Sequence, residues 1–280
     1  MRVAWVGNSY TYFNDLPKML ATLAALAPEP IQVTHEEVTP GGTSLTDHAD
    51  LSIATGKKTK KMLDAEAGWN YVVLQDQSQT PGGGKNGDSG LAPGVAKAQA
   101  EEVLHSFFAP AIASADATPV LYSTWGRHDG DPLNAECCGY GTFGSMTRRT
   151  TEGYEAYASV LRKAAPTSPA PIIVPAGRAF ELVYNASEKD PLANSSLFSC
   201  LFHHSSSDGE LVEQRSGEDC VLDEYGKGGH PSPLGTYLIA CTFVAAMLRQ
   251  SPVGIAWAPD GVSDARRDLM QRIALQASGL

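Results

Sequence analysis

Short apolar runs alternate with helix-length segments along most of the chain. The apolar runs lie at 2–6, 31–38, 70–75, 119–124 and 171–175. Runs such as 71–74 (YVVL) have no polar face, which is typical of strands that helices cover on both sides. We therefore expect a mainly parallel sheet of five strands.

The segments between and after these runs are long enough to form helices. They lie at 15–27, 56–67, 93–114, 147–165, 176–186, 233–249 and 263–278. Alternation of strand and helix at this spacing indicates right-handed βαβ units. The predicted fold class is α/β, a three-layer α/β/α arrangement in which residues 1–280 form a single domain.

Two segments interrupt the alternation. Residues 80–92 are rich in glycine, and 187–231 is a long polar stretch without periodicity. Loops of this length in a compact domain are usually functional or mobile. An α/β element follows each of them, so we interpret both as loops and not as linkers between domains.

The charge balance argues against nucleic acid as a partner. The 280 residues carry a formal net charge of −10, whereas binding to phosphate backbones needs clustered Lys and Arg. The one basic run, 57–61, is interpreted as the solvated face of a helix. No window approaches the ~20 apolar residues of a membrane span. A strand-like run directly follows Met1, so we expect a cytoplasmic protein or the mature form of a secreted one.

The cysteine pattern favours an extracellular setting. None of the five cysteines belongs to a C-x-x-C pair. Cys200 and Cys220 bracket a polar loop and could form a disulfide, while Cys241 is expected to be a buried thiol. Glycosylation sequons at 185–187 and 194–196 point the same way, although one is expected by chance.

Candidate chemistry gathers where the strands end, because ligands of open α/β sheets bind beyond the carboxyl ends of the strands. The segments there are 7–9 (GNS), 41–44 (GGTS), 75–78 (QDQS) and 125–128 (WGRH), and 229–232 (GHPS) precedes a late helix.

Two of these segments carry a nucleophile and a base. Ser9 lies between a strand and a helix, where its hydroxyl would face the positive end of that helix. His230 precedes Ser232, a good helix cap, and a nearby helix N-terminus favours the neutral imidazole that a general base needs. Taken alone, a serine at such a junction is more often a helix cap than a catalytic residue.

In order, these segments resemble the four sequence blocks of the SGNH (GDSL-like) hydrolases, over nearly the whole chain. The resemblance implies a flavodoxin-like sheet and an esterase with Ser9 as nucleophile and His230 as base. Gly42 would donate its backbone N–H to the oxyanion. Gln77 stands where the family usually has asparagine, and Asn8, a candidate substrate contact, where many members have aspartate.

One position departs from the family pattern. The family generally has aspartate three residues before the histidine, and this chain has Lys227. Asp223, Glu224 or Asp219 could replace it, the enzyme could use a Ser9–His230 dyad, or the site could be inactive. Loss of the orienting aspartate costs about four orders of magnitude in turnover in a well-studied triad.

Two further strand-end residues are candidates for the substrate pocket. Trp125 could offer a flat apolar surface and Arg127 could hold an anionic group. A core tryptophan with a surface arginine explains the pattern equally well.

Three other patterns carry no predicted chemistry. The stretch 87–91 (GDSGL) follows no strand, and 82–85 lacks the first glycine and the hydroxyl residue of a phosphate loop. Cys200, His203, His204 and Cys220 fit no common zinc spacing. We therefore expect no metal and no cofactor.

These observations predict a serine esterase that removes a small acyl group, such as acetyl, from a carbohydrate or another polar alcohol. The alternative is a catalytically impaired protein of the same fold that binds a glycan or small ligand, with Lys227 marking the loss of activity. A nucleotide- or flavin-binding domain ranks last, because no glycine-rich phosphate motif follows the first strand.

Overall fold

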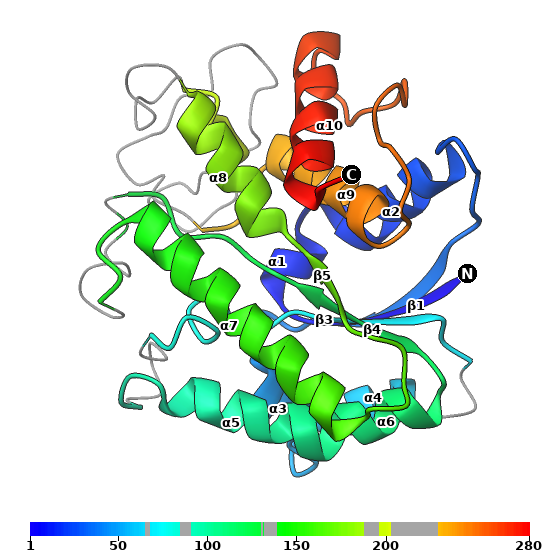
Figure 1. Cartoon of the computed structure of the whole chain (residues 1–280), viewed down its shortest axis with the longest axis vertical. Coiled ribbons are helices and arrows are strands. Elements are labelled where there is room, and N and C mark those ends of the chain that lie inside the picture. The colour runs from blue at the N-terminus through cyan, green and yellow to red at the C-terminus, as the bar shows by residue number, and fades with distance from the viewer. Residues whose placement is uncertain (65–67, 85–90, 130, 132–138, 188–195, 203–228) are drawn as a thin grey trace.

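A parallel sheet of five strands forms the centre of the molecule (Figure 1). The computed structural model describes residues 1–64, 68–84, 91–129, 131, 139–187, 196–202 and 229–280. The strand order is β2-β1-β3-β4-β5, and every neighbouring pair is parallel. This is the flavodoxin-like order. The predicted fold class is confirmed.

Each strand lies within or close to its predicted range. The strands are β1 Arg2–Val6, β2 Thr34–Val38, β3 Tyr71–Leu74, β4 Thr118–Tyr122 and β5 Ile172–Val174. The second strand begins three residues later than predicted. There Ile31 donates its backbone N–H to the carbonyl of Ala24 at the end of the preceding helix, so the chain joins the sheet only afterwards.

The helices follow the predicted pattern with a few differences. They are α1 Ser9–Tyr12, α2 Leu16–Ala25, α3 Leu45–Ala49, α4 Ala54–Met62, α5 Val95–Val103, α6 Ala109–Ser114, α7 Phe143–Ala164, α8 Ala176–Ala186, α9 Pro233–Ala246 and α10 Asp264–Ser278. Short 3-10 turns lie at Phe13–Asp15 and Ser199–Leu201. The predicted helix at 93–114 is divided, because a π-helical turn at Leu104–Phe108 separates α5 from α6. The helix predicted at 147–165 begins earlier, where the Thr142 side chain caps α7.

Two apolar layers pack against the sheet, one on each face. Along β1, Val3 and Trp5 point into a core shared with α2, α8, α9 and α10, whereas Ala4 and Val6 point into a core shared with α4, α5, α6 and α7. Figure 1 shows these two groups of helices on opposite sides of the sheet. Because side chains alternate along a strand, β1 must be apolar on both faces, as its sequence is.

The two interrupting segments are described only in part. Residues 80–84 form turns that pack against α7, where the Pro81 carbonyl lies directly against Gly153, and 196–202 include the turn at Ser199–Leu201. Cys200 is disulfide-bonded, while its expected partner Cys220 lies outside the described residues. Cys241 is a free, buried thiol, as predicted. In the described part of the chain, no helix has both the length and the apolar character needed to cross a membrane.

Candidate active site

The hydroxyl of Ser9 contacts the imidazole of His230 where the sheet ends. Ser9 Oγ lies 2.8 Å from His230 Nε2. Ser9 is the first residue of α1, and Asn8 caps that helix by accepting a hydrogen bond from the N–H of Tyr10. The nucleophile and base named from the sequence are therefore within hydrogen-bond reach of each other, as base-assisted attack by a serine requires.

The imidazole of His230 rests on aromatic side chains that follow Ser9. The Phe13 ring stacks on it at 4.3 Å and 15°, and the Tyr10 ring meets it edge-on at 5.4 Å. These contacts fix the plane of the imidazole. Because both rings belong to the segment that carries Ser9, they pack His230 directly against that segment.

The backbone before His230 passes through a narrow gap. A Cβ atom on Gly229 would lie 2.1 Å from the Tyr10 hydroxyl and 3.2 Å from Arg127 Cγ. The Gly229 carbonyl accepts a hydrogen bond from the indole N–H of Trp125 at 3.0 Å. Only glycine fits this path without displacing a neighbour.

Asn8 orients the side chain of Gln77. The Asn8 amide donates to the Thr43 carbonyl at 2.9 Å and to Gln77 Oε1 at 2.8 Å. The side-chain oxygen of Asn8 accepts from the Tyr10 N–H. Because the Thr43 carbonyl can only accept and the Tyr10 N–H can only donate, the two contacts fix which amide atom of Asn8 is nitrogen. Asn8 is fully buried. It therefore contributes to the site by positioning Gln77 rather than by an exposed surface.

Three N–H donors lie on the segments that Asn8 joins, and the described residues leave all three without an acceptor. The backbone N–H groups of Ser9 and Gly42 and the Nε2 amide of Gln77 have no hydrogen-bond partner among the described residues. Gly42 lies on an exposed turn with φ of +73°, next to Thr43, which holds Asn8. Donors left open beside a nucleophile are what stabilisation of an oxyanion needs.

The buried carboxylate of Asp76 connects the backbone of Gln77 to that of Leu45, at the start of α3. The carboxylate accepts hydrogen bonds from the backbone N–H groups of Leu45 and Gln77 at 2.9 and 2.8 Å, and from the Tyr157 hydroxyl at 2.8 Å. Burial disfavours the charged form and raises the pKa of Asp76 to about 6, although these donors oppose the shift. The sequence pointed to the amide at Gln77 and missed the carboxylate one residue earlier.

Trp125 has no free face for a substrate. It is fully buried between Tyr10, stacked at 4.9 Å, and Phe180, stacked at 4.2 Å. The reading of Trp125 as an open platform is therefore corrected to that of a core tryptophan, whose indole N–H holds the backbone beside His230.

Arg127 is largely buried, which contradicts the alternative interpretation of a surface arginine. Its guanidinium lies 3.2 Å from the Asp131 carboxylate, and the two side chains are 14% and 4% exposed. A longer contact of 3.4 Å joins it to the Ser78 hydroxyl. Arg127 borders the path of Gly229, so its position near the site is compatible with the expected substrate contact.

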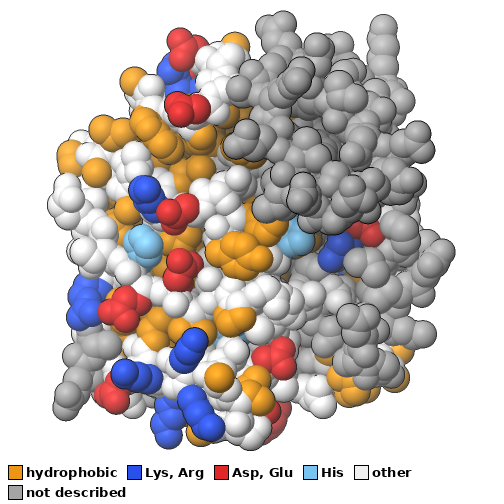
Figure 2. Space-filling model, turned by 180° about the vertical axis from the view of Figure 1, so that it is seen from behind, with side chains coloured by type: hydrophobic (Ala, Val, Ile, Leu, Met, Phe, Trp, Pro, Cys, Tyr) orange, Lys and Arg blue, Asp and Glu red, His pale blue; other side chains and the backbone are white. Residues whose placement is uncertain are grey.

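The residues around the missing acid are not described. Asp223, Glu224, Asp219 and Lys227 all lie outside the described residues, and so do His203, His204 and the stretch 87–91. Figure 2 shows that surface histidine and hydrophobic side chains reach the border of this undescribed part of the chain.

Several solved structures match the fold over most of the chain. A protein from Slackia heliotrinireducens, named as a candidate SGNH hydrolase, is 23% identical, with 88% of this chain and 98% of that chain covered and a TM-score of 0.55. An acetylxylan esterase from Geobacillus stearothermophilus is 12% identical, with 92% and 96% covered and a TM-score of 0.52.

The chain has the fold of the SGNH hydrolases. A DUF4886 family protein from Bacteroides uniformis shares this fold at 15% identity, with 99% of this chain and 94% of that chain covered and a TM-score of 0.65. No protein-family model matches the sequence, and no curated protein matches it. The fold implied by the sequence blocks is thus confirmed, while identities this low show nothing finer.

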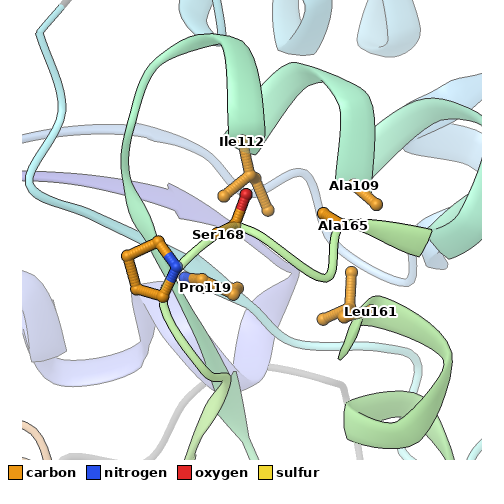
Figure 3. A pocket seen from close by; sticks show the side chains of 7 residues that line it. Ala109, Ile112, Pro119, Leu161, Ala165 and Ser168 are labelled. Carbon is orange, nitrogen blue, oxygen red and sulfur yellow. The ribbon is translucent and has the colours of Figure 1, made fainter. Parts of the chain in front are cut away.

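A small pocket elsewhere on this SGNH fold is a poor candidate for the site. Figure 3 shows it between α6, the end of α7 and the start of β4; its lining is mostly apolar and includes Ile112, Pro119 and Leu161. Pro119 lies at the amino end of β4, at the edge of the sheet opposite Ser9. No nucleophile–base pair lines it.

No metal site accompanies Ser9 in the part of the chain that the structure describes. There, no group of three or more His, Cys, Asp or Glu side chains could hold a metal ion. Ser9 and its surroundings provide a hydroxyl, an imidazole and open N–H donors, which are the groups that acyl transfer requires.

Proposed function

We propose that this chain is a serine hydrolase that cleaves carboxylic esters through an acyl-enzyme on Ser9. The 2.8 Å contact between Ser9 Oγ and His230 Nε2 carries the proposal. His230 takes the proton from the hydroxyl as Ser9 attacks the ester carbonyl, and returns it to the departing alcohol. Water, activated by the same imidazole, then releases the acid and restores Ser9.

The oxyanion of each tetrahedral intermediate needs donors that are in place before the reaction. The N–H groups of Ser9, Gly42 and Gln77 are open among the described residues and lie on the segments that Asn8 and Asp76 connect. We assign these three donors to the oxyanion hole. Such donors are each worth roughly a hundredfold or more in turnover.

For the substrate, we propose a small acyl ester of a carbohydrate or another polar alcohol. Polar residues dominate the strand-end segments around Ser9. One structure of the same fold is named as an acetylxylan esterase, and variants of it with a serine or an aspartate changed to alanine are named as catalytic mutants. The expected enzyme therefore acts on acetyl esters in preference to long acyl chains.

A fluorophosphonate probe tests the proposal. We expect a covalent adduct on Ser9, located by mass spectrometry, and none on Ser9→Ala. Hydrolysis of p-nitrophenyl acetate should disappear in the same variant. The proposal fails if Ser9 of the folded protein is unlabelled while a control serine esterase in the same tube is fully labelled.

A second candidate function rests on Lys227. With lysine in place of the usual acid, the fold could bind an ester or glycan without cleaving it. Binding of acetylated xylooligosaccharides by calorimetry, without labelling of Ser9 and without released acetate, would favour this alternative.

A further inference from the structure

Asn14 holds the backbone directly after His230. Its Nδ2 donates to the Pro231 carbonyl at 2.9 Å and to the Thr236 hydroxyl at 2.9 Å. The carbonyl can only accept, so the nitrogen assignment is secure and both amide hydrogens are used. Asn14 thereby ties the segment that begins at Ser9 to the first turn of α9.

His230 is consequently held between two anchored peptide carbonyls. The carbonyl before it, at Gly229, is held by Trp125, and the carbonyl after it, at Pro231, is held by Asn14. The Phe13 ring fixes the imidazole plane between them. The remaining freedom of the base is small, and Asn14 restrains the side nearer α9.

Asn14 lies only five residues after Ser9 along the chain. A short helix, Ser9–Tyr12, and a 3-10 turn at Phe13–Asp15 join the two positions. One local segment thus carries Ser9 at one end and, at the other, Asn14, which binds the carbonyl next to His230.

We propose that Asn14 is a positioning residue that sets the distance between Ser9 and His230. The inference rests on the proposed function. A displacement of about 1 Å between reacting groups can cost roughly a hundredfold in rate. The hydrogen bond from Asn14 to the Pro231 carbonyl is therefore expected to affect turnover and to affect substrate binding much less.

The backbone of Asn14 offers a competing explanation. Its φ of 54° is left-handed, and asparagine tolerates that region better than most residues. On that explanation, asparagine is present only because it tolerates the backbone conformation of the turn, and its hydrogen bond to Pro231 has no effect on the rate. Aspartate also tolerates this conformation and has the same shape, but it cannot donate to Pro231, so Asn14→Asp separates the two explanations.

The experiment measures the rate at which a fluorophosphonate labels Ser9, together with kcat and KM for p-nitrophenyl acetate. In Asn14→Asp and in Asn14→Gly, which keeps the turn and adds no charge, we expect labelling and kcat to fall by about tenfold to a hundredfold. KM should stay within about twofold, since the donors do not touch the ester. Urea unfolding at matched pH shows whether each variant is folded.

Thr236→Val is the matched control. It removes one of the two acceptors of Asn14 and leaves the bond to Pro231 O, so labelling within about twofold of the unaltered protein is expected. Equal labelling of Asn14→Asp, Asn14→Gly and the unaltered protein would overturn the inference and leave the proposed function standing. A similar loss in Thr236→Val would also overturn it, because the hold on Pro231 would then not be the cause. Absence of labelling in the unaltered protein would overturn the proposed function itself.

Discussion

The side-chain amide of Asn8 donates a hydrogen bond to Oε1 of Gln77 across 2.8 Å. Because this bond occupies the oxygen of Gln77, the nitrogen is left for another acceptor. On the proposed function, Gln77 in this way takes the place of the shorter asparagine found in the family that the sequence resembles. Asn8 is the reason that the longer side chain has one defined orientation.

We expect Gln77→Glu to lower kcat for p-nitrophenyl acetate by about a hundredfold or more. Glutamate keeps the acceptor for Asn8 and the size of the side chain, but replaces the donor with a negative charge facing the developing oxyanion. Kinetics at pH 8 and an unfolding curve check the prediction. Unchanged kcat in a folded variant would remove Gln77 from the oxyanion hole.

Asp76 should make stability depend on pH. Its pKa is raised by burial from 3.8 to about 6, so the folded state binds this proton more tightly than the unfolded state does. Protonated Asp76 therefore adds about 3 kcal/mol to the free energy of unfolding at a pH below the unfolded pKa of 3.8. This contribution is lost as the pH rises through 6.

In Asp76→Asn the amide oxygen can still accept from Leu45 and Gln77, and its nitrogen can donate to the Tyr157 oxygen. The variant should therefore lack this component of the pH dependence. Urea unfolding at intervals from pH 4 to 8 provides the test. Parallel curves for the variant and the unaltered protein would contradict the raised pKa.

Gly229→Ala should disrupt the site by a specific clash. The added Cβ would lie 2.1 Å from the Tyr10 hydroxyl, so the backbone before His230 must move and kcat/KM should fall by about tenfold or more. Adding Tyr10→Phe removes that oxygen while retaining the ring that stacks on Trp125. The double variant should regain much of the loss, and strict additivity of the two changes would refute this explanation.

Substitutions at Lys227 and Asp223 test which residue, if any, serves as the acid of the triad. If lysine is a defect of the triad, Lys227→Asp should raise kcat. If Asp223 takes over the role, Asp223→Ala should lower kcat by up to about four orders of magnitude without unfolding the protein. Full activity in Asp223→Ala would leave a Ser9–His230 dyad or another acceptor as the better account.

The sequence predicted the sheet and singled out Ser9 and His230 because their signals are local. Continuous apolar runs identify buried strands wherever they occur, and Ser9 and His230 each stand next to a strand or helix boundary. The four-residue helix α1 and the π-helical turn at Leu104–Phe108 were missed, since neither is long enough to produce its own periodicity.

The supports of the site depend on contacts between distant segments. Trp125 follows β4, where substrate contacts are expected, yet only packing decides that its ring lies between Tyr10 and Phe180. The sequence alone similarly indicates a turn residue at Asn14, and only the structure shows its hydrogen bond to Pro231. No local pattern in the sequence predicts contacts of this kind between residues far apart in the chain.

Ser9 and His230 are 221 positions apart in the chain. During synthesis the Ser9 hydroxyl is made long before the imidazole that contacts it. A fragment that ends before Gly229 contains all five strands but only a chemically ordinary serine hydroxyl. On the proposed function, the growing chain remains inert toward esters until the segment leading into α9 has joined the sheet.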